Sequence, residues 1–360
     1  LPNLAGDNIG NFLFHDKAQL VAVADPISET GCYGYNADPN RLGGREAGKK
    51  RIDSFYAEKL SKPGYSAART YIDFREMLDK EDLDAVVIST PDHWHALQAV
   101  YAANRGKHIY GQKPMSLCIA EGQAMVAAVK KNGITFQTGS QQRSDNYFRM
   151  ACEFIRNNVI GKLEKIEVGL PGGHFRWNKT DEDFSQEVRP VPAWMTDFSL
   201  WLGPAPKRDY IPALHRNMTW RNNLDYSGGA ITDWGAHHLD IVQWALGKDG
   251  SGPVAIENLK SDMPDHKEIF NTAAHYSFEV VYEEGTRVFV SDTFPNGIKF
   301  YGEKGQTIFV TRGKLETNPP SLIRTKLGDN AVKLYKSSRH ESNFIDCIFS
   351  GEPTICNVDI

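Results

Sequence analysis

This chain of 360 residues lacks long hydrophobic segments, closely spaced cysteine pairs and any large excess of charge of one sign. No apolar run approaches the roughly 20 residues that a membrane-spanning helix needs, so we expect no membrane partner. The formal net charge of −4 gives no electrostatic reason to expect nucleic acid as a partner. The five cysteines form no C-x-x-C pair, which argues against a disulfide scaffold and against a thiolate metal site.

A glycine-rich phosphate-binding loop is also missing near the start of the chain. Only Gly6 and Gly10 occur there, and no strand precedes them. Because the chain begins abruptly at Leu1 without an initiator methionine, we expect a trimmed sequence. A cytoplasmic location is the default expectation, but an exported, periplasmic enzyme would lose its signal and present the same start.

The first 140 residues alternate short apolar runs with amphipathic segments, which is typical of parallel strands connected by helices. One apolar run ends in Asp25, and a second, over residues 85–90, is stopped by Pro91. A chain of 360 residues favours two domains. These patterns predict an α/β domain over residues 1–140, with a Rossmann-type, doubly wound parallel sheet.

Beyond residue 140 the pattern is that of an α+β domain. A long irregular stretch, 171–227, is dense in Pro, Trp, Arg and Asn, and loops of that length usually carry or cover a functional site. Apolar residues then alternate with polar ones, which predicts a second domain over residues 141–360 with a large, mostly antiparallel sheet. The open face of such a sheet often joins subunits, so we expect a homodimer or homotetramer. The predicted strands cover 273–282, 287–293, 298–301 and 306–311.

Parallel sheets bind ligands at the carboxyl ends of their strands. Asp25 occupies such an end, where an acid can accept hydrogen bonds from both adenosine ribose hydroxyls and thereby favour NAD over NADP. The same residue could equally be a turn residue before Pro26. Polar groups follow three other predicted strands, at Thr90-Pro91-Asp92-His93, Gln112-Lys113-Pro114 and Ser140-Gln141-Gln142.

The strongest local signal is the segment 228–247, which reads as a helix opened by two glycines and closed by a third. Asp233 lies one turn before His237, and an acid in that position can fix the tautomer of the ring and raise its basicity. An ordinary surface Asp–His pair is the alternative. His238 and Asp240 are also metal-ligand types, but adjacent histidines on a helix point about 100° apart. We therefore expect no metal.

Three motifs together resemble the oxidoreductases typified by glucose-fructose oxidoreductase and myo-inositol 2-dehydrogenase, the Gfo/Idh/MocA family. The resemblance covers nearly the whole chain and implies that Lys113 lies beside the nicotinamide and the substrate. It further implies that Asp233 and His237 bind the substrate hydroxyl and relay its proton. Gln112 departs from the family pattern, which has Glu there. The motifs are Thr90 to His95, Gly111-Gln112-Lys113-Pro114, and Gly228-Gly229 through Asp233, Gly235, His237 and Asp240.

These observations predict an NAD(P)-dependent oxidoreductase that acts on a CH–OH group of a sugar, inositol or related polyol. His237 would be the general base, Lys113 would stabilise the oxyanion, and Asp233 would orient His237 or hold a neighbouring hydroxyl. NAD is slightly favoured over NADP. The predicted cofactor-binding residues are Asp25, Thr90, Pro91, His93, His95, Gln112, Lys113 and Gln142. The predicted substrate-binding residues are Arg143, His174, Arg176, Trp220, Asp233 and His237.

The same residues are compatible with two other functions. Relatives of this family resemble glycoside hydrolases or lyases that keep NAD bound, oxidise one sugar carbon transiently and eliminate the glycosidic bond. A non-catalytic, sugar-sensing protein could use the same fold, although a pure binding role does not require three titratable residues. Release of free NADH in proportion to product would separate a dehydrogenase from both.

Overall fold

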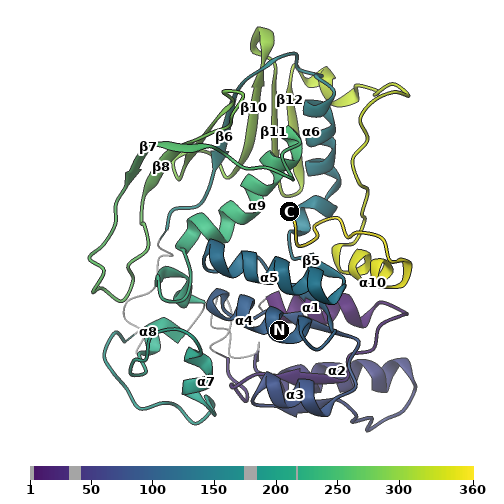
Figure 1. Cartoon of the computed structure of the whole chain (residues 1–360), viewed down its shortest axis with the longest axis vertical. Coiled ribbons are helices and arrows are strands. Elements are labelled where there is room, and N and C mark those ends of the chain that lie inside the picture. Colours follow the sequence, from purple (N-terminus) through teal and green to yellow (C-terminus); the bar gives the residue numbers. More distant parts are fainter. Residues whose placement is uncertain (1–3, 32–41, 174–184, 216–217) are drawn as a thin grey trace.

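The computed structural model describes residues 4–31, 42–173, 185–215 and 218–360, and its two sheet regions lie at opposite ends of the molecule (Figure 1). The N-terminal region contains short parallel strands flanked by helices. Its strands are β1 (Ala22–Ala24), β2 (Arg69–Tyr71), β3 (Ala85–Ile88), β4 (His108–Gly111) and β5 (Phe136–Thr138). Its helices are α1 (Leu4–Leu13), α2 (Arg45–Lys59), α3 (Phe74–Lys80), α4 (Asp92–Ala103) and α5 (Ile119–Asn132).

The parallel arrangement of these strands is confirmed, but the strands form two separate pieces. One piece is the pair β1–β2 and the other has the order β3-β4-β5. Within the described residues β1 and β3 do not pair with each other, and residues of both strands line one cavity of about 940 Å³. The Rossmann-type parallel sheet that the apolar runs predict is thus confirmed, with its hydrogen-bonded strand pairs divided between these two groups. Hydrophobic periodicity identifies strands but does not report which strands are neighbours.

The C-terminal region is built on a sheet of seven strands, in the order β12-β11-β10-β6-β9-β8-β7. Only the β6–β9 pair is parallel, so the predicted mostly antiparallel sheet is confirmed. The edge strand β7 was not predicted, because its residues are mostly exposed and do not alternate in polarity. The strands are β6 (Leu163–Gly169), β7 (Ala255–Ser261), β8 (Tyr276–Val281), β9 (Arg287–Ser291), β10 (Gly297–Gly302), β11 (Thr307–Thr311) and β12 (Lys314–Asn318).

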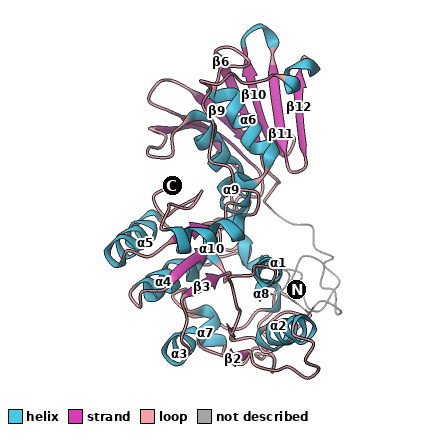
Figure 2. Ribbon diagram, turned by 90° about the vertical axis from the view of Figure 1, so that its right-hand side faces the viewer, coloured by secondary structure: helices cyan, strands magenta, loops and turns pink. Residues whose placement is uncertain are grey.

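Helices α6 (Asn146–Arg156) and α9 (Gly229–Leu246) cover one face of this sheet (Figure 2). Side chains along β8 alternate between buried and partly exposed, as expected for a sheet with one covered face. Fully buried Ile166, Ile241 and Phe300 belong to the core between helices and sheet. No helix of the described part of the chain covers the opposite face of the sheet, which we call the open face (Figures 1 and 2). Three short 3₁₀ helices, η1 (Gln141–Ser144), η4 (Glu303–Gly305) and η5 (Pro320–Arg324), complete this part of the chain.

The long stretch that sequence patterns predict to be irregular contains short helices, over residues 185–227. This segment, which we call the aromatic insert, joins the N-terminal region just after β1. The Trp194 carbonyl accepts a hydrogen bond from the Ser28 N–H at 2.8 Å, and Met195 forms an antiparallel bridge with Ile27. The insert therefore links the two regions beside Asp25. Its helices are α7 (Phe198–Leu202), α8 (Pro212–His215) and the 3₁₀ helix η3 (Thr219–Asn222).

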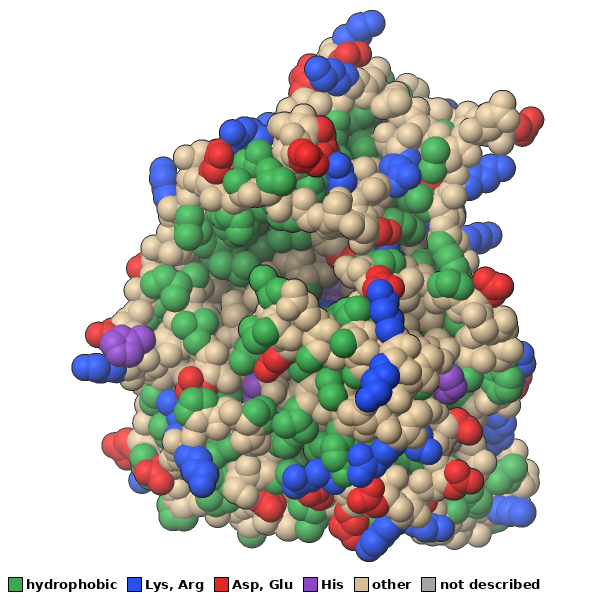
Figure 3. Space-filling model, in the orientation of Figure 1, with side chains coloured by type: hydrophobic (Ala, Val, Ile, Leu, Met, Phe, Trp, Pro, Cys, Tyr) green, Lys and Arg blue, Asp and Glu red, His purple; other side chains and the backbone are tan. Residues whose placement is uncertain are grey.

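The last helix, α10 (His340–Ser350), returns to the N-terminal region. Phe344 of α10 packs edge-on against Phe12 and Tyr110 in a small aromatic core. None of the described helices combines the length and the apolar character that a bilayer crossing requires. Basic and acidic side chains are interspersed on the face shown in Figure 3.

Candidate active site

A buried ion pair joins the two regions of the molecule at the carboxyl end of β4. Lys113 follows β4, and its Nζ donates to the backbone carbonyl of Asp233 at 2.8 Å and also to Oδ1 of the same residue. Both side chains are about 5 % exposed. A lysine ammonium has three N–H donors, and the described residues accept hydrogen bonds from two of them, which leaves the third for another acceptor.

Arg221, in η3, adds a second cation to the same carboxylate. Its Nε lies 3.3 Å from Oδ1 of Asp233, and its guanidinium lies 4.4 Å from the centre of the Trp220 ring. Burial alone would raise the pKa of Asp233, but Arg221 and Lys113 hold it well below its usual range. Burial lowers the pKa of Lys113, and the positive charge of Arg221 lowers it further while Asp233 opposes the change. Sequence reasoning missed Arg221, since an arginine in an irregular stretch gives no periodic signal.

Asp92, the first residue of α4, is the fourth charged residue of this site. It is 2 % exposed, and its Oδ2 accepts a hydrogen bond from the Ser227 hydroxyl at 2.6 Å. Burial raises the pKa of this carboxyl, although Arg221 opposes the rise. Ser227 directly precedes the glycines that open α9, so this hydrogen bond connects the starts of two helices. Lys113, Asp233, Arg221 and Asp92 are called the charge cluster below.

His237 lies one turn beyond Asp233 on α9 and is 5 % exposed. Burial, together with the charges of Lys113 and Arg312, lowers the pKa of His237 well below the usual value. Its Nδ1 has no hydrogen-bond partner among the described residues, which is unusual for a buried polar atom. The expectation that Asp233 fixes the His237 tautomer is not met, because no hydrogen bond joins the two. Two cations attract the carboxylate more strongly than a neutral imidazole does.

The cavity of about 940 Å³ beside the charge cluster has a size suited to a small-molecule ligand. Several predicted binding residues line it together with two residues that sequence reasoning did not select, Asp92 and Arg221. Gln112 is one of the lining residues, and its buried Oε1 has no hydrogen-bond partner among the described residues. The predicted residues in the lining are Asp25, Thr90, Pro91, Gln112, Lys113 and Trp220.

Three predicted cofactor contacts are instead occupied within the protein and do not line this cavity. His95 bridges two backbone carbonyls, with Nε2 2.9 Å from Thr90 O and Nδ1 2.6 Å from Pro114 O. The ring of His93 packs in the aromatic insert, with Nε2 3.2 Å from the Trp201 carbonyl. Gln142 Oε1 lies 3.3 Å from Nδ1 of His238. Asp92 and His93 are successive residues of α4 and point about 100° apart, so His93 cannot share the direction of Asp92.

Arg143, predicted to bind substrate, is buried in an ion-pair network instead. It is 1 % exposed, and its guanidinium donates to the carboxylates of Asp240 and Asp249, with both Nη2 contacts at 2.7 Å. Its charge is thus used to hold η1, α9 and the loop after α9 together. The other predicted wall residues, His174 and Arg176, lie outside the described residues. Trp220 remains the described member of that wall that lines the cavity.

Arg143→Met is expected to lower the free energy of unfolding by about 3 kcal/mol, because it removes a buried guanidinium and leaves the partly buried carboxylates of Asp240 and Asp249 without their cation. Arg75→Met is a matched control, since Arg75 pairs with Asp73 at the surface and should contribute no more than about 1 kcal/mol. Urea denaturation of both variants measures the difference. A loss below about 1 kcal/mol for Arg143→Met would contradict the structural role.

Titration of Asp25 should make the free energy of unfolding depend on pH. Burial raises its pKa from 3.8 to about 7, although the Ile27 N–H donates to its Oδ1 at 2.9 Å and Arg45 also opposes the change. The folded protein keeps this proton between pH 4 and pH 7 while the unfolded chain loses it, so the free energy of unfolding falls as pH rises through that window.

Asp25→Asn keeps an oxygen for the Ile27 N–H and removes the titration. The Asn variant is expected to be more stable than the wild type at pH 8, by about 1–3 kcal/mol, and similar to it at pH 4. Urea denaturation at the two pH values tests this. The same difference at both pH values would mean that Asp25 does not titrate in this range.

Two sequence models of one family match the chain. Residues 46–140 match "Oxidoreductase family, NAD-binding Rossmann fold", and residues 150–319 match "Oxidoreductase family, C-terminal alpha/beta domain". The chain belongs to this oxidoreductase family. It is the Gfo/Idh/MocA family that the three motifs indicate, so the protein is an oxidoreductase that uses a nicotinamide cofactor.

Individual relatives match this chain over shorter segments or at lower identity. Myo-inositol 2-dehydrogenase of Thermotoga maritima is 30 % identical over 181 residues, which cover 50 % of this chain and 41 % of the relative. A glycosyl hydrolase family 109 protein of Shewanella baltica is 29 % identical over 117 residues, 32 % of this chain and 25 % of the relative. The WlbA dehydrogenase of Bordetella pertussis, solved with NADH and UDP-GlcNAcA, shares the fold with a TM-score of 0.60 at 16 % identity. That alignment covers 99 % of this chain and 88 % of WlbA.

Proposed function

We propose that this protein oxidises a CH–OH group of a sugar, inositol or related polyol at the charge cluster and His237. The observation that carries the proposal is the combination of a buried lysine with one uncommitted donor and a buried imidazole whose Nδ1 has no partner among the described residues. A dehydrogenase of alcohols needs both: a cation beside the oxygen and a base for its proton.

Two polar residues of the cavity suit a nicotinamide dinucleotide. Asp25 presents a carboxylate at the carboxyl end of β1, where ribose hydroxyls can donate to it. Gln112 lines the same cavity next to Lys113, and its buried Oε1 has no partner among the described residues. When bound, the nicotinamide accepts the hydride that leaves the substrate carbon. Asp25 together with Thr90, Pro91 and Gln112 would hold the cofactor, with NAD favoured over NADP.

Residues of the protein would bind the substrate oxygen and accept its proton. Lys113 donates its third N–H to that oxygen and stabilises the negative charge that develops there. Neutral His237 accepts the hydroxyl proton at Nδ1, and the low pKa keeps the imidazole in the form that can accept it. Asp233 fixes Lys113 through two hydrogen bonds. Trp220 supplies an aromatic wall suited to a polyhydroxylated ring.

A glycoside hydrolase or lyase that keeps NAD bound through a transient oxidation and elimination is the second candidate. The similarity to a glycosyl hydrolase family 109 protein favours it. The same lysine and histidine would serve its oxidation step, so the residues alone do not separate the two functions.

One experiment distinguishes these functions. The protein is mixed with NAD or NADP and a panel of inositols, hexoses and glycosides, and both absorbance at 340 nm and products are followed. A dehydrogenase forms NADH in proportion to oxidised product, whereas the glycosidase releases the aglycone without net NADH. Absence of any cofactor-dependent reaction across the panel would contradict both and favour a sugar-binding protein.

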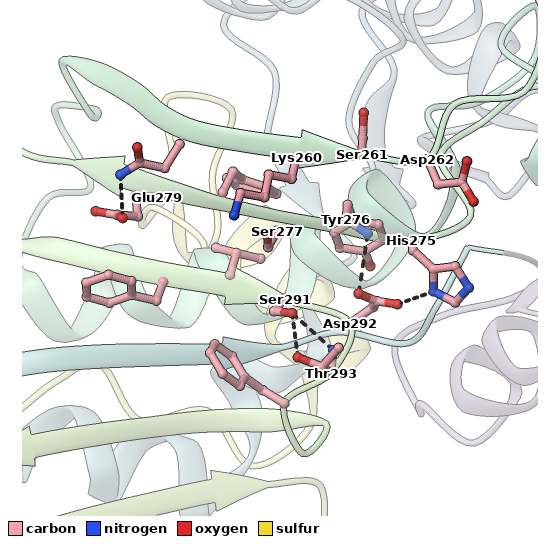
Figure 4. A pocket seen from close by; sticks show the side chains of 15 residues that line it. Lys260, Ser261, Asp262, His275, Tyr276, Ser277, Glu279, Ser291, Asp292 and Thr293 are labelled. Carbon is pink, nitrogen blue, oxygen red and sulfur yellow. Dashed lines mark hydrogen bonds and ion pairs between the residues drawn. The ribbon is translucent and has the colours of Figure 1, made fainter.

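We further propose that the open face of the seven-stranded sheet joins subunits. A shallow groove of about 770 Å³ crosses β7, β8 and β9 on this face (Figure 4). Phe289 of β9 lines this groove and is only partly buried, which is costly for a large apolar side chain unless it is covered. The mass in solution, measured by light scattering for the wild type and for Phe289→Lys, tests whether this face forms a dimer or tetramer.

A further inference from the structure

Arg221 occupies a position that the proposed reaction does not yet explain. Its Nε and the Nζ of Lys113 converge on the same oxygen, Oδ1 of Asp233, while Oδ2 accepts no hydrogen bond from the described residues. All three side chains are about 5 % exposed, so water screens their charges only weakly. One carboxylate oxygen therefore serves two cations in a low-dielectric setting.

We propose that Arg221 is a positioning residue that shares Asp233 with Lys113 and so weakens the hold of that carboxylate on the lysine. A lysine paired alone with a buried carboxylate would be held as a tightly bound ammonium. With Arg221 on the same oxygen, part of the negative charge is already neutralised, and a like charge stands near the ammonium. Lys113 is then freer to direct a proton toward a substrate oxygen.

The charged groups around Lys113 shift its pKa in the directions that this proposal requires. Asp233 from α9 and Asp92 from α4 favour the charged lysine, while burial and Arg221 from η3 oppose it. His237, also from α9, is kept neutral by burial and by the neighbouring cations. Arg221 is thus the nearby positive side chain that lowers the pKa of Lys113. Removing it should therefore strengthen the lysine–carboxylate pair.

The aromatic insert offers a matched control. Arg208 also pairs with a carboxylate, Asp225, at 3.7 Å, and its guanidinium also lies over an aromatic ring, Tyr226, at 5.8 Å. Arg208 has no contact with the charge cluster, so Arg208→Gln removes an arginine–aromatic contact from the same segment without touching Asp233. Arg221→Lys keeps a cation but loses the planar group on Trp220. This variant therefore separates the effect of the charge from the effect of packing against Trp220.

The test begins with the protein free of cofactor and substrate. Lysine side chains are labelled with ¹³C, the Lys113 signal is identified by its absence in Lys113→Arg, and its pKa is read from an NMR titration. Arg221→Gln is expected to raise that pKa by about one unit, a tenfold higher proton affinity, because a like charge nearby is lost. Arg208→Gln is expected to leave it unchanged, and Arg221→Lys to stay near the wild type.

Two outcomes would overturn the proposal. One is an unchanged Lys113 pKa in folded Arg221→Gln, and the other is an equal shift in Arg221→Lys, which would assign the effect to packing on Trp220. Near-ultraviolet circular dichroism reports whether the variants are folded, and Arg221→Met replaces the Gln variant if the latter is not. Met removes the charge and keeps the aliphatic stem.

Activity provides a second readout, which rests on the proposed function. If the protein oxidises a polyol, the alkaline limb of its kcat–pH profile should move up by about one unit in Arg221→Gln, in step with Lys113. A wild type without activity would contradict the proposed function and leave the NMR result intact. An active wild type whose alkaline limb and Lys113 titration are both unmoved by Arg221→Gln would contradict the role of Arg221 alone.

Discussion

Lys113→Met is expected to lower kcat by about a hundred- to a thousandfold with little change in KM. The methionine keeps the length and the apolar stem of the side chain but removes the donor that stabilises negative charge on the substrate oxygen. That charge develops in the transition state, so the loss should appear in kcat. Asp233 keeps Arg221 as its partner, which limits the cost of leaving a buried carboxylate.

Steady-state kinetics with the substrate identified in the panel measure this effect. Lys130→Met is the control, because Lys130 pairs with Asp359 on the surface and is 59 % exposed. Its kinetics should match the wild type. A kcat for Lys113→Met within threefold of the wild type would remove the lysine from the reaction and leave it with a structural role between the two regions.

His237→Asn is expected to lower kcat by about a hundred- to ten-thousandfold, which is the usual contribution of a positioned general base. Because the pKa of His237 is lowered, its neutral form persists below pH 6.5, so the acid limb of the wild-type profile should lie below that value. The Asn variant should lose this limb. Hydride transfer and proton removal are then both slow in the variant.

A histidine elsewhere in the same region provides the comparison. His275 pairs with Asp292 at 2.7 Å in the groove of the open sheet face and is 74 % exposed (Figure 4). His275→Asn should leave kcat and both limbs unchanged. Turnover by His237→Asn at the wild-type rate would exclude His237 as the general base.

The sequence located part of this site by periodicity. Asp233 and His237 stand one turn apart in a helix whose glycine start and glycine end are both legible, and the structure places that helix, α9, over residues 229–246. Lys113 could be assigned to the site only because its motif resembles that of a known family. The use of a nicotinamide cofactor, the oxidoreductase family and the two sheet types could all be predicted in this way.

Other parts of the site depend on contacts between distant segments. Asp92 lies inside a motif that was selected, but only the direction of α4 decides that Asp92 faces the cavity while His93 faces the aromatic insert. The two carboxylates that occupy Arg143 lie 97 and 106 residues away in sequence. A basic residue followed by Asn222 and Asn223 before the paired glycines is a pattern that could have drawn attention to Arg221.

Local periodicity and motifs were sufficient to predict the family, the helix that carries Asp233 and His237, and most of the strands and helices of the two sheet regions. The tertiary structure alone decided that Asp233 serves Lys113 and Arg221 and not His237. It also decided that residues of β1 and β3 line the same cavity. Both outcomes depend on distance in space, where electrostatic attraction and backbone hydrogen bonding act, and local sequence patterns do not encode that distance.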